Sequence, residues 1–319
     1  MKPIRKLATA LILSAASSAA FAEYPERPIK ILVPFAAGGP SDAIARTLGR
    51  ALSPAIGQPV IVENRPGAEG QIAAQATFAA PPDGYTIFLG GSSATVALAA
   101  LKKDLPFNPL EFTPITTVAG VAWGLFVNRE VPVKSVEELV RHARANPDKL
   151  SYAVSANSEF MAASQFMKAT GVRMLKVPFK GSAQAVPELI AGRVDVYFCP
   201  ITPERIAYAK DGRLRLLATV ATKRNPLVPE VPTMAEAGVQ GMVIPSWNVL
   251  VGPPRMPAAV AEKLAREVAK VLDDPDVRAQ FANLVLQAGS STPQELRAMQ
   301  ASDSKLWHEF VREHGIQKE

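Results

Sequence analysis

The sequence predicts an α/β protein of two lobes, each a mostly parallel sheet flanked by helices. Three observations favour this class. Short apolar runs rich in β-branched residues alternate with segments of helical periodicity. This rhythm begins near residue 29 and begins again in the middle of the chain. The 319 residues also suffice for two cores, since single cores rarely grow beyond about 250–300 residues.

The first half of the chain contains a strand–helix rhythm typical of a parallel sheet. Strands are predicted at 29–33, 60–62 and 86–89, with helices at 42–52 and 71–79 between them. The first helix has Ile44, Leu48 and Leu52 at steps of four, which places them on one face. This face is expected to pack on the sheet.

The second half repeats the rhythm and then becomes helical. Strands are predicted at 150–155, 175–179, 194–198 and 214–220, and helices at 136–145, 159–169 and 186–191. After Pro245 the pattern predicts helices and no sheet, including one over 258–272. We therefore expect the tail to pack on the first lobe, with chain crossings near 121–126 and 243–248. The predicted division is 23–122 plus 246–319 for lobe 1 and 123–245 for lobe 2.

The first 22 residues have the pattern of a secretory signal peptide. Lys2, Arg5 and Lys6 precede an apolar run, and Ala20-Phe21-Ala22 fits a cleavage site. The apolar run is shorter than the ~20 residues that span a bilayer. The sequence therefore predicts export to the periplasm and a mature chain that does not itself span the membrane.

Charge and residue usage exclude several functional classes. Removal of the three basic residues of the signal segment lowers the formal charge from +6 to +3. No dense Lys/Arg run with interleaved aromatics follows, so nucleic-acid binding is not expected. The single cysteine, Cys199, cannot form an internal disulfide. We expect a monomer without metal or cofactor.

Four loops of small polar residues each follow a predicted strand. They are 33–42, 90–95, 155–158 and 178–182. Open α/β sheets bind ligands beyond the carboxyl ends of their strands. In the first loop, Gly38 and Gly39 precede a helix, and free N–H groups at a helix start suit a carboxylate. An ordinary glycine-rich turn with a cap would have the same sequence.

These loops contain neutral donors rather than a fixed positive charge. An anion bound in this way is easier to release, because a buried ion pair carries a large desolvation cost. Lys180 is the exception, and we expect it to point to solvent. Aromatic residues on or beside the loops and the second crossing either contact an apolar ligand body or pack in the core: Phe35, Phe179, Tyr197, Phe198 and Trp247.

Enzyme signatures are mostly absent from the sequence. It contains no G-x-S-x-G, Walker or G-x-G-x-x-G motif. The three histidines lie in predicted helices outside the four loops, which disfavours a metal site and Ser–His catalysis. The alternative is an α/β hydrolase or lyase that uses Ser92, Asp42 or Cys199. A lone cysteine is more often a small core residue.

Five segments together resemble one known family. They are VPFAAGGPSDAIAR (33–46), VENRPGAEGQIAA (62–74), PPDGYTIFLG (81–90), VPFKGSAQAVPELIAGRVDVYF (177–198) and VPEVPTMAEAG (228–238). In order and spacing they are similar to the Bug-type substrate-binding proteins of tripartite tricarboxylate transporters. The resemblance extends over nearly the whole mature chain.

The resemblance implies a type II periplasmic binding protein, or Venus flytrap, with one small organic carboxylate between the lobes. It also implies membrane transporter subunits as partners. A sensor that docks to a receptor instead has the same sequence features. Together with the four loops, the resemblance gives these expected ligand-binding residues: Phe35, Ala37, Gly38, Gly39, Ser41, Asp42, Ser92, Ser93, Thr95, Ser155, Asn157, Ser158, Phe179, Gly181 and Ser182.

One segment departs from the family pattern. The family commonly has a glycine-rich stretch where this chain has Ser155 to Met161, and Glu159 adds a possible negative charge there. We expect Glu159 to cap the next helix and face solvent. If it enters the cleft instead, it would disfavour a distal carboxylate or select an amino or amide group.

Overall fold

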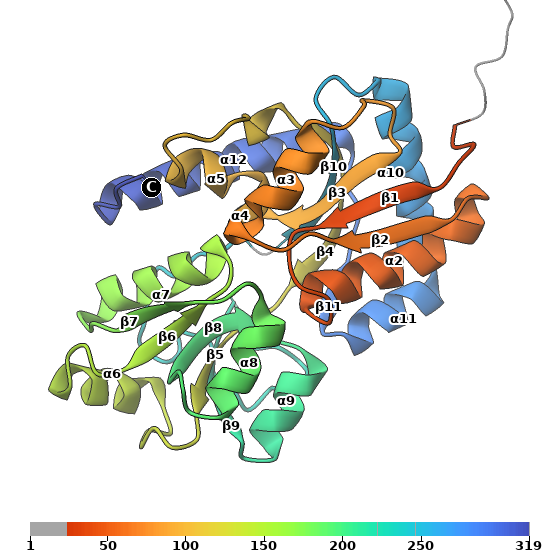
Figure 1. Cartoon of the computed structure of the whole chain (residues 1–319). Coiled ribbons are helices and arrows are strands. Elements are labelled where there is room, and N and C mark those ends of the chain that lie inside the picture. The colour runs from red at the N-terminus through yellow and green to blue at the C-terminus, as the bar shows by residue number, and fades with distance from the viewer. Residues whose placement is uncertain (1–23, 222, 246, 319) are drawn as a thin grey trace, which may run out of the picture.

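The computed structural model describes residues 24–221, 223–245 and 247–318, so the predicted signal peptide lies outside the described residues. Figure 1 shows two lobes, each built around one sheet with helices on its faces. Within the described ranges, no helix has the length and apolar character needed to cross a membrane. The same ranges contain no group of three or more His, Cys, Asp or Glu side chains arranged to hold a metal ion.

The first lobe contains a six-stranded sheet with the order β11-β4-β10-β3-β1-β2. Its strands are β1 (Ile29–Val33), β2 (Val60–Asn64), β3 (Thr86–Gly91), β4 (Thr113–Val121), β10 (Trp247–Gly252) and β11 (Leu286–Ala288). Its helices are α2 (Pro40–Ile56), α3 (Gln71–Phe78), α4 (Ser92–Thr95), α5 (Ala97–Leu101), α10 (Ala258–Asp273), α11 (Pro275–Asn283) and α12 (Pro293–Glu313), with short turns η1 (Ala68–Gly70) and η2 (Pro109–Glu111).

Both faces of this sheet are buried, which explains the continuous apolar runs of its strands. On one face, Ile31 and Val33 of β1 pack with Leu48 of α2 and Leu264 of α10. On the other face, Leu32 belongs to a cluster with aromatic side chains and residues of α3 and α12. The sheet therefore holds the start of α2 rigidly at the end of β1.

The second lobe contains a five-stranded sheet with the order β7-β6-β8-β5-β9. Its strands are β5 (Trp123–Asn128), β6 (Ser151–Val154), β7 (Leu175–Pro178), β8 (Val196–Pro200) and β9 (Leu214–Val220). Its helices are α6 (Val136–Ala145), α7 (Asn157–Thr170), α8 (Ser182–Ile190) and α9 (Pro203–Lys210). The chain enters this sheet at Ala122, between β4 and β5, and leaves it between β9 and β10.

The α/β class is confirmed, but the sheets are mixed rather than mostly parallel. In the first lobe, β1 is parallel to β2 and β3, whereas β10 runs antiparallel to β3 and β4. In the second lobe, β5 is antiparallel to both of its neighbours. Strands β5 and β10 each follow a chain crossing without a connecting helix, and β11, which follows α11, also pairs antiparallel with β4.

Two further expectations about the elements are wrong, and two strands were not predicted. Residues 247–252 form β10, so the tail contributes strands as well as helices to the first sheet. Residues 92–95 form the short helix α4 rather than a loop. Strands β4 and β5 were not predicted, because Pro114, Gly120 and Gly124 interrupt their apolar pattern.

Candidate ligand-binding site

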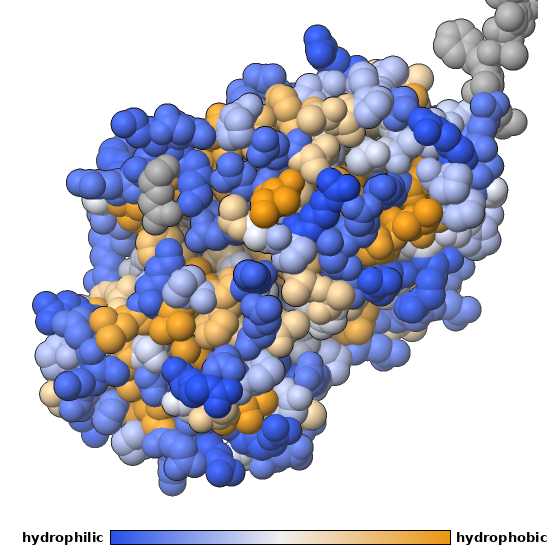
Figure 2. Space-filling view, in the orientation of Figure 1, coloured by the Kyte–Doolittle hydropathy of each residue, from blue (hydrophilic) through white to orange (hydrophobic). Residues whose placement is uncertain are grey.

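A cavity lies where the two lobes meet, beyond the ends of β1, β3, β6 and β8. Its empty space is about 670 Å³, a volume that includes space open to solvent. In the view of Figure 2, the outer surface of the molecule is mainly hydrophilic, with hydrophobic groups scattered over it. The cavity is lined by Phe35, Gly39, Pro40, Ser41, Gly91, Ser92, Ser93, Val121, Trp123, Ser155, Ala156, Ser158, Glu159, Ser182, Pro200, Pro245, Trp247 and Asn248.

The first-lobe wall is a loop that ends in helix α2. Gly38 has a φ of 82°, in the left-handed region that glycine tolerates best. Gly39 is the N-cap and Pro40 the first helical residue, a position that suits proline because the missing N–H would be unpaired anyway. This local chemistry explains why the loop was predictable from sequence.

Backbone amides of this loop are free to bind an anion. In the part of the chain that the structure describes, the N–H groups of Ala36, Ala37 and Ser41 donate no hydrogen bond to protein atoms. The positive end of the α2 dipole lies behind them. Free amides at a helix start form a suitable site for a carboxylate.

Asp42 holds this loop in place rather than lining the cavity. Its carboxylate accepts the Gly38 N–H at 3.0 Å and the Arg46 Nε–H at 3.0 Å. The Asn64 amide fixes the other end by donating to the Phe35 carbonyl at 3.0 Å. Burial raises the pKa of Asp42, but the hydrogen bonds from Arg46 and Gly38 outweigh it and lower the pKa below its usual value.

Helix α4 has hydroxyls that are committed to other protein groups. The Ser92 hydroxyl accepts the Trp307 indole N–H at 2.9 Å and hydrogen-bonds to Asp303. Burial raises the pKa of Asp303 to about 6, although that hydrogen bond lowers it. The Thr95 hydroxyl donates to the Gly91 carbonyl at 3.0 Å. Both hydroxyls therefore hold this part of the wall in place.

The lobes touch at several places, including the ring contact of Phe160 with Phe310, and two of the contacts lie beside the cavity. The Asn157 N–H donates to the Ser93 hydroxyl at 2.7 Å, which joins α7 to α4. On the other side, Gly181 lies against Ala36, where an added Cβ would be 3.3 Å from the Ala36 nitrogen. Only a residue without a side chain fits at this approach without a shift of its neighbour.

The second-lobe wall contains a buried carboxyl group. Glu159 is only 2 % exposed and lines the cavity. Its carboxylate accepts the N–H groups of Ser155 and Ala156, the latter at 3.1 Å. The expectation of a solvent-facing cap is therefore wrong in one respect: Glu159 does cap α7, but it does so inside the protein.

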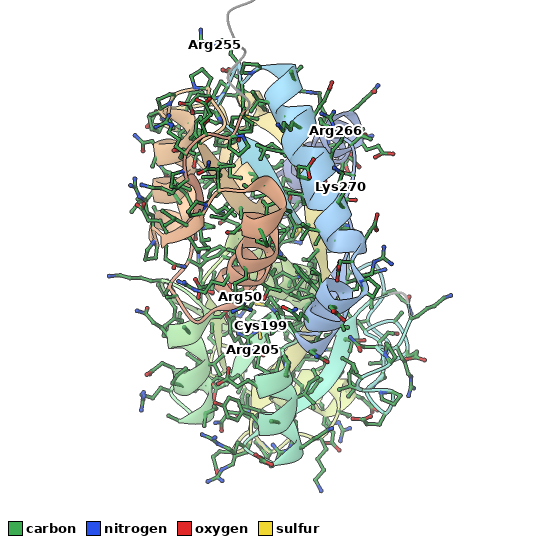
Figure 3. The ribbon with its side chains drawn as sticks, turned by 90° about the vertical axis from the view of Figure 1, so that its right-hand side faces the viewer. Arg50, Cys199, Arg205, Arg255, Arg266 and Lys270 are labelled. Carbon is green, nitrogen blue, oxygen red and sulfur yellow. The ribbon has the colours of Figure 1, made fainter. Side chains whose placement is uncertain are left out.

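Three hydroxyls and one guanidinium surround this carboxyl group. The Tyr197 hydroxyl donates to Glu159 at 2.7 Å and lies 2.9 Å from the Ser182 hydroxyl. The Ser155 hydroxyl is 2.9 Å from the carboxylate. The buried guanidinium of Arg205 lies 5.9 Å from the centre of the Tyr197 ring, and Figure 3 places Arg205 near the boundary between the lobes.

Burial dominates the titration of this cluster. It raises the pKa of Glu159 to about 7, while the hydrogen bonds from Tyr197 and Ser155 and the charge of Arg205 act in the opposite direction. Burial and the nearby Glu159 charge also raise the pKa of Tyr197 well above its usual value. A cavity-wall carboxyl group whose pKa lies near neutral pH is a feature of functional sites.

Four polar groups of the lining have no partner within the described chain: the Ser41 and Ser158 hydroxyls, the Asn248 amide and the buried Trp123 indole N–H. Buried polar groups are normally hydrogen-bonded, so unpaired ones that line a cavity are candidates for ligand contacts. The apolar part of the wall includes Trp247, which is 37 % exposed.

Eight of the predicted site residues line the cavity: Phe35, Gly39, Ser41, Ser92, Ser93, Ser155, Ser158 and Ser182. Seven do not: Ala37, Gly38, Asp42, Thr95, Asn157, Phe179 and Gly181. Of these, Asn157 and Gly181 contact the other lobe beside the cavity. Phe179 lines an outer groove beside exposed Lys180, which points to solvent as expected.

Sequence reasoning missed the residues near the chain crossings. Trp123 and Asn248 lie at the starts of β5 and β10, which were not predicted as strands. Their polar groups reach the cavity only because both crossings pass between the lobes there. A signal was present, since each crossing contains one of the chain's three tryptophans, and aromatic residues often line ligand pockets.

The groups proposed for a hydrolase are not arranged for catalysis. Cys199 lies buried in β8, where burial raises the pKa of its thiol to about 12. A reactive cysteine would need a lowered pKa. Ser92 is bonded to Trp307 and Asp303 and not to a histidine. The described side chains thus form a binding cavity without an activated nucleophile among these candidates.

Two α/β lobes around a cavity at their junction define the class of two-lobed periplasmic binding proteins. The chain belongs to the Tripartite tricarboxylate transporter family receptor group, whose sequence model matches residues 44–316. BugT of Bordetella pertussis is 34% identical over 298 residues, covering 92% of this chain and 90% of BugT.

Two solved structures are similar over almost their whole length. The periplasmic binding protein BugD has a TM-score of 0.87 at 30% identity and covers 93% of this chain and 100% of BugD. Rpa4515 of R. palustris, solved with adipate, has a TM-score of 0.88 at 31% identity with the same coverages. These two structures confirm the two-lobed fold, and BugD is described as a periplasmic binding protein.

Proposed function

We propose that this protein captures a small organic carboxylate in the periplasm and delivers it to the membrane subunits of a tripartite transporter. The observation that carries the proposal is the start of α2, where loop amides lack protein partners and Gly39 and Ser41 line the cavity, an arrangement that suits a carboxylate. The adipate of Rpa4515 supports the same ligand class. No bond is made or broken, so binding is the whole activity.

Binding is proposed to close the two lobes around the ligand. The division proposed is residues 23–122 plus 246–319 against 123–245, with movement at the two chain crossings. The contacts Ser93–Asn157 and Gly181–Ala36 join the lobes beside the cavity in this structure. Closure would complete the ligand contacts and exclude water, and membrane subunits would recognise the closed form.

The test is a thermal-shift screen of the mature protein against mono-, di- and tricarboxylates, followed by calorimetry of each responder. A ligand at about 100 times its Kd stabilises by roughly 2.7 kcal/mol. We expect saturable binding by one group of acids, without turnover. A panel of acids that all fail to bind, with mass spectrometry showing no ligand carried from the host, would overturn the proposal.

Export and delivery need separate tests. Mass determination of the protein from the periplasmic fraction should give a chain that begins after residue 22. Co-expression with its transporter subunits should restore uptake of the identified acid in cells that lack the binding protein. Uptake that is independent of this protein would instead favour a sensor role.

A further inference from the structure

The helix start in the second lobe already holds a carboxylate of the chain itself. Helix α7 points its N-terminus at the cavity, and Glu159 accepts the Ser155 and Ala156 amides there. These are the backbone donors that a second carboxylate of a ligand would use. They are occupied, so the second lobe must recognise a ligand through other atoms.

The directions of the hydroxyl protons follow from the ionisation state of Glu159. When Glu159 is ionised it only accepts, so Tyr197 donates to it at 2.7 Å and Ser155 donates at 2.9 Å. The one proton of Tyr197 is then used, so Ser182 donates to the Tyr197 oxygen at 2.9 Å. Ser155 and Ser182 line the cavity, and both are left there with lone pairs only.

The charged groups around Glu159 are few. From β8, Tyr197 and the neutral Cys199 thiol face the cluster, and from α9 the Arg205 guanidinium approaches. Arg205 donates to the Pro200 carbonyl and lies over the Tyr197 ring rather than in a hydrogen bond with Glu159. It offsets part of the buried negative charge from behind and contributes no donor to the cavity lining.

We propose that this cluster selects an organic acid whose far end is a hydrogen-bond donor without negative charge, such as an amide, hydroxyl or ammonium group, over an acid with a second carboxylate. The inference rests on the proposed function, because the first carboxylate is taken to bind the α2 amides. A second carboxylate would meet oxygen lone pairs beside a buried carboxylate, and like charges placed together disfavour binding.

Protonation of Glu159 reverses the polarity of this wall. A neutral Glu159 must donate its proton to a neighbouring hydroxyl oxygen, which turns the proton of Tyr197 toward Ser182 or Ser155. A serine proton is then free to point into the cavity and can bind a carboxylate. Burial raises the pKa of Glu159 to about 7, so the change falls in a measurable range.

The test compares matched ligands that differ only at the far end. Calorimetry measures Kd for succinate, adipate and terephthalate and for the monoamide of each, at about pH 8.5 and about pH 6, where both carboxylates of the diacids remain largely ionised. We expect the best-fitting monoamide to bind about 10-fold or more tightly than its diacid at the higher pH. This preference should shrink at the lower pH.

Two variants test whether the groups around Glu159 cause the preference for monoamides over diacids. In Glu159→Gln the amide oxygen accepts the backbone N–H groups and the NH₂ donates to a hydroxyl, which mimics the protonated state. This variant should lose the monoamide preference at both pH values. Tyr197→Phe frees the Ser182 hydroxyl to donate and should narrow the preference even if Glu159→Gln folds poorly. Glu137→Gln, on the exposed start of α6, is the matched control and should behave as wild type.

The outcomes separate the two proposals. Diacids that bind wild type more tightly than their monoamides at about pH 8.5 would overturn this inference and leave the proposed function intact. The same conclusion follows if both cluster variants keep the wild-type preference. Failure of every acid and every monoamide to bind would overturn the proposed function itself.

Discussion

Two helices begin at the same cavity with an acidic residue at the third position, yet the two residues act differently. In α2 the residue is Asp42, and in α7 it is Glu159. The Asp42 carboxylate pairs with Arg46 and accepts a hydrogen bond from one backbone amide, that of Gly38. The Glu159 side chain is longer by one methylene, and its carboxylate accepts hydrogen bonds from the Ser155 and Ala156 amides at the start of its own helix.

The surroundings explain this difference. Arg46 lies half-exposed, one turn along α2, and pulls the Asp42 carboxylate away from the cavity. No cation forms an ion pair with Glu159 among the described residues; hydroxyls surround it, with Arg205 farther behind. One helix start is therefore left open for an external anion, while the other is filled from within. The comparison supports the proposed orientation of the ligand, with its carboxylate toward the first lobe.

The first prediction, with the largest expected effect, concerns a substitution that places a negative charge at the open start of α2. Ser41→Asp places a carboxylate on the second residue of α2, in the cavity lining. The new charge should compete for the free amides and repel the ligand, weakening carboxylate binding by roughly 100-fold. It should also raise the melting temperature slightly, because an acid is favourable at a helix N-terminus. Calorimetry and thermal melts measure the two effects.

Ser41→Asn is the control for this change, since it has nearly the same shape without the charge. Its Kd should stay within several-fold of wild type. If Ser41→Asp binds the ligand as wild type does, the carboxylate does not bind at α2 and the orientation derived from the comparison is wrong.

The second prediction concerns stability of the ligand-free protein against pH. The pKa of Glu159 is raised to about 7 from a usual 4.5, so between these values the folded state holds a proton that the unfolded state has lost. Stability is thus fully present below about 4.5 and is lost as the pH rises through 7. The loss is on the order of 2–3 kcal/mol, and denaturant titrations at several pH values measure it.

Glu159→Gln should flatten this slope above about pH 6. A shallower slope should remain at lower pH, because the pKa of Asp303 is raised to about 6 in the same direction. Groups with lowered pKa values, such as Asp42 and Glu63, act only at more acidic pH. If the pH dependence of stability between about pH 6 and 8 persists in Glu159→Gln, another titrating group causes it.

The same comparison shows what the sequence can predict. The α2 loop was predictable, because Gly38, Gly39, Pro40 and Asp42 create its shape through contacts with near neighbours in the chain. The family resemblance and the alternation of strands and helices likewise predicted the α/β class and two lobes. These features depend on local chemistry or on patterns that extend over whole elements.

The second-lobe cluster was not predictable in the same way. Glu159 lies four residues after Ser155, but its burial depends on Tyr197 and Arg205, which come from β8 and α9. A glutamate before an apolar helix is normally a solvated cap, and only the tertiary packing reverses that expectation. Trp123 and Asn248, near the crossings, were not predicted as cavity residues for a similar reason. Their strands lie in mixed sheets whose pairing is not local.

The third prediction tests how the two walls approach each other. In Gly181→Ala the new methyl carbon would lie 3.3 Å from the Ala36 nitrogen, so either the loop shifts or the lobes stay farther apart. Overpacking of this kind costs about 1–3 kcal/mol, which corresponds to roughly 5–150-fold weaker binding if closure bears the whole cost. Small-angle scattering with ligand should show a larger radius of gyration than wild type.

Ala183→Ser changes an exposed residue on the same turn and serves as the control. It should bind and scatter as wild type. Unchanged affinity in Gly181→Ala would mean that Ala36 and its loop move aside at no cost, and that the approach of the walls does not limit binding.

The fourth and smallest prediction separates free hydroxyls from committed ones. Ser158→Ala removes a cavity hydroxyl without a protein partner, so it should weaken binding by about 0.5–1.5 kcal/mol and leave the melting temperature unchanged. Ser92→Ala removes the acceptor of the buried Trp307 N–H, so it should lower stability by about 1–3 kcal/mol with a smaller effect on affinity. Calorimetry and thermal melts on both variants give the four values.

The opposite pattern would reverse the assignment of the two serines. Greater loss of affinity in Ser92→Ala would mean that its hydroxyl leaves Trp307 and turns to the ligand when the lobes close. Ser92 and Ser158 both line the cavity and come from opposite lobes, so residue type and position do not distinguish them. What distinguishes them is whether another protein group already holds the hydroxyl, and the same property separates the open start of α2 from the filled start of α7.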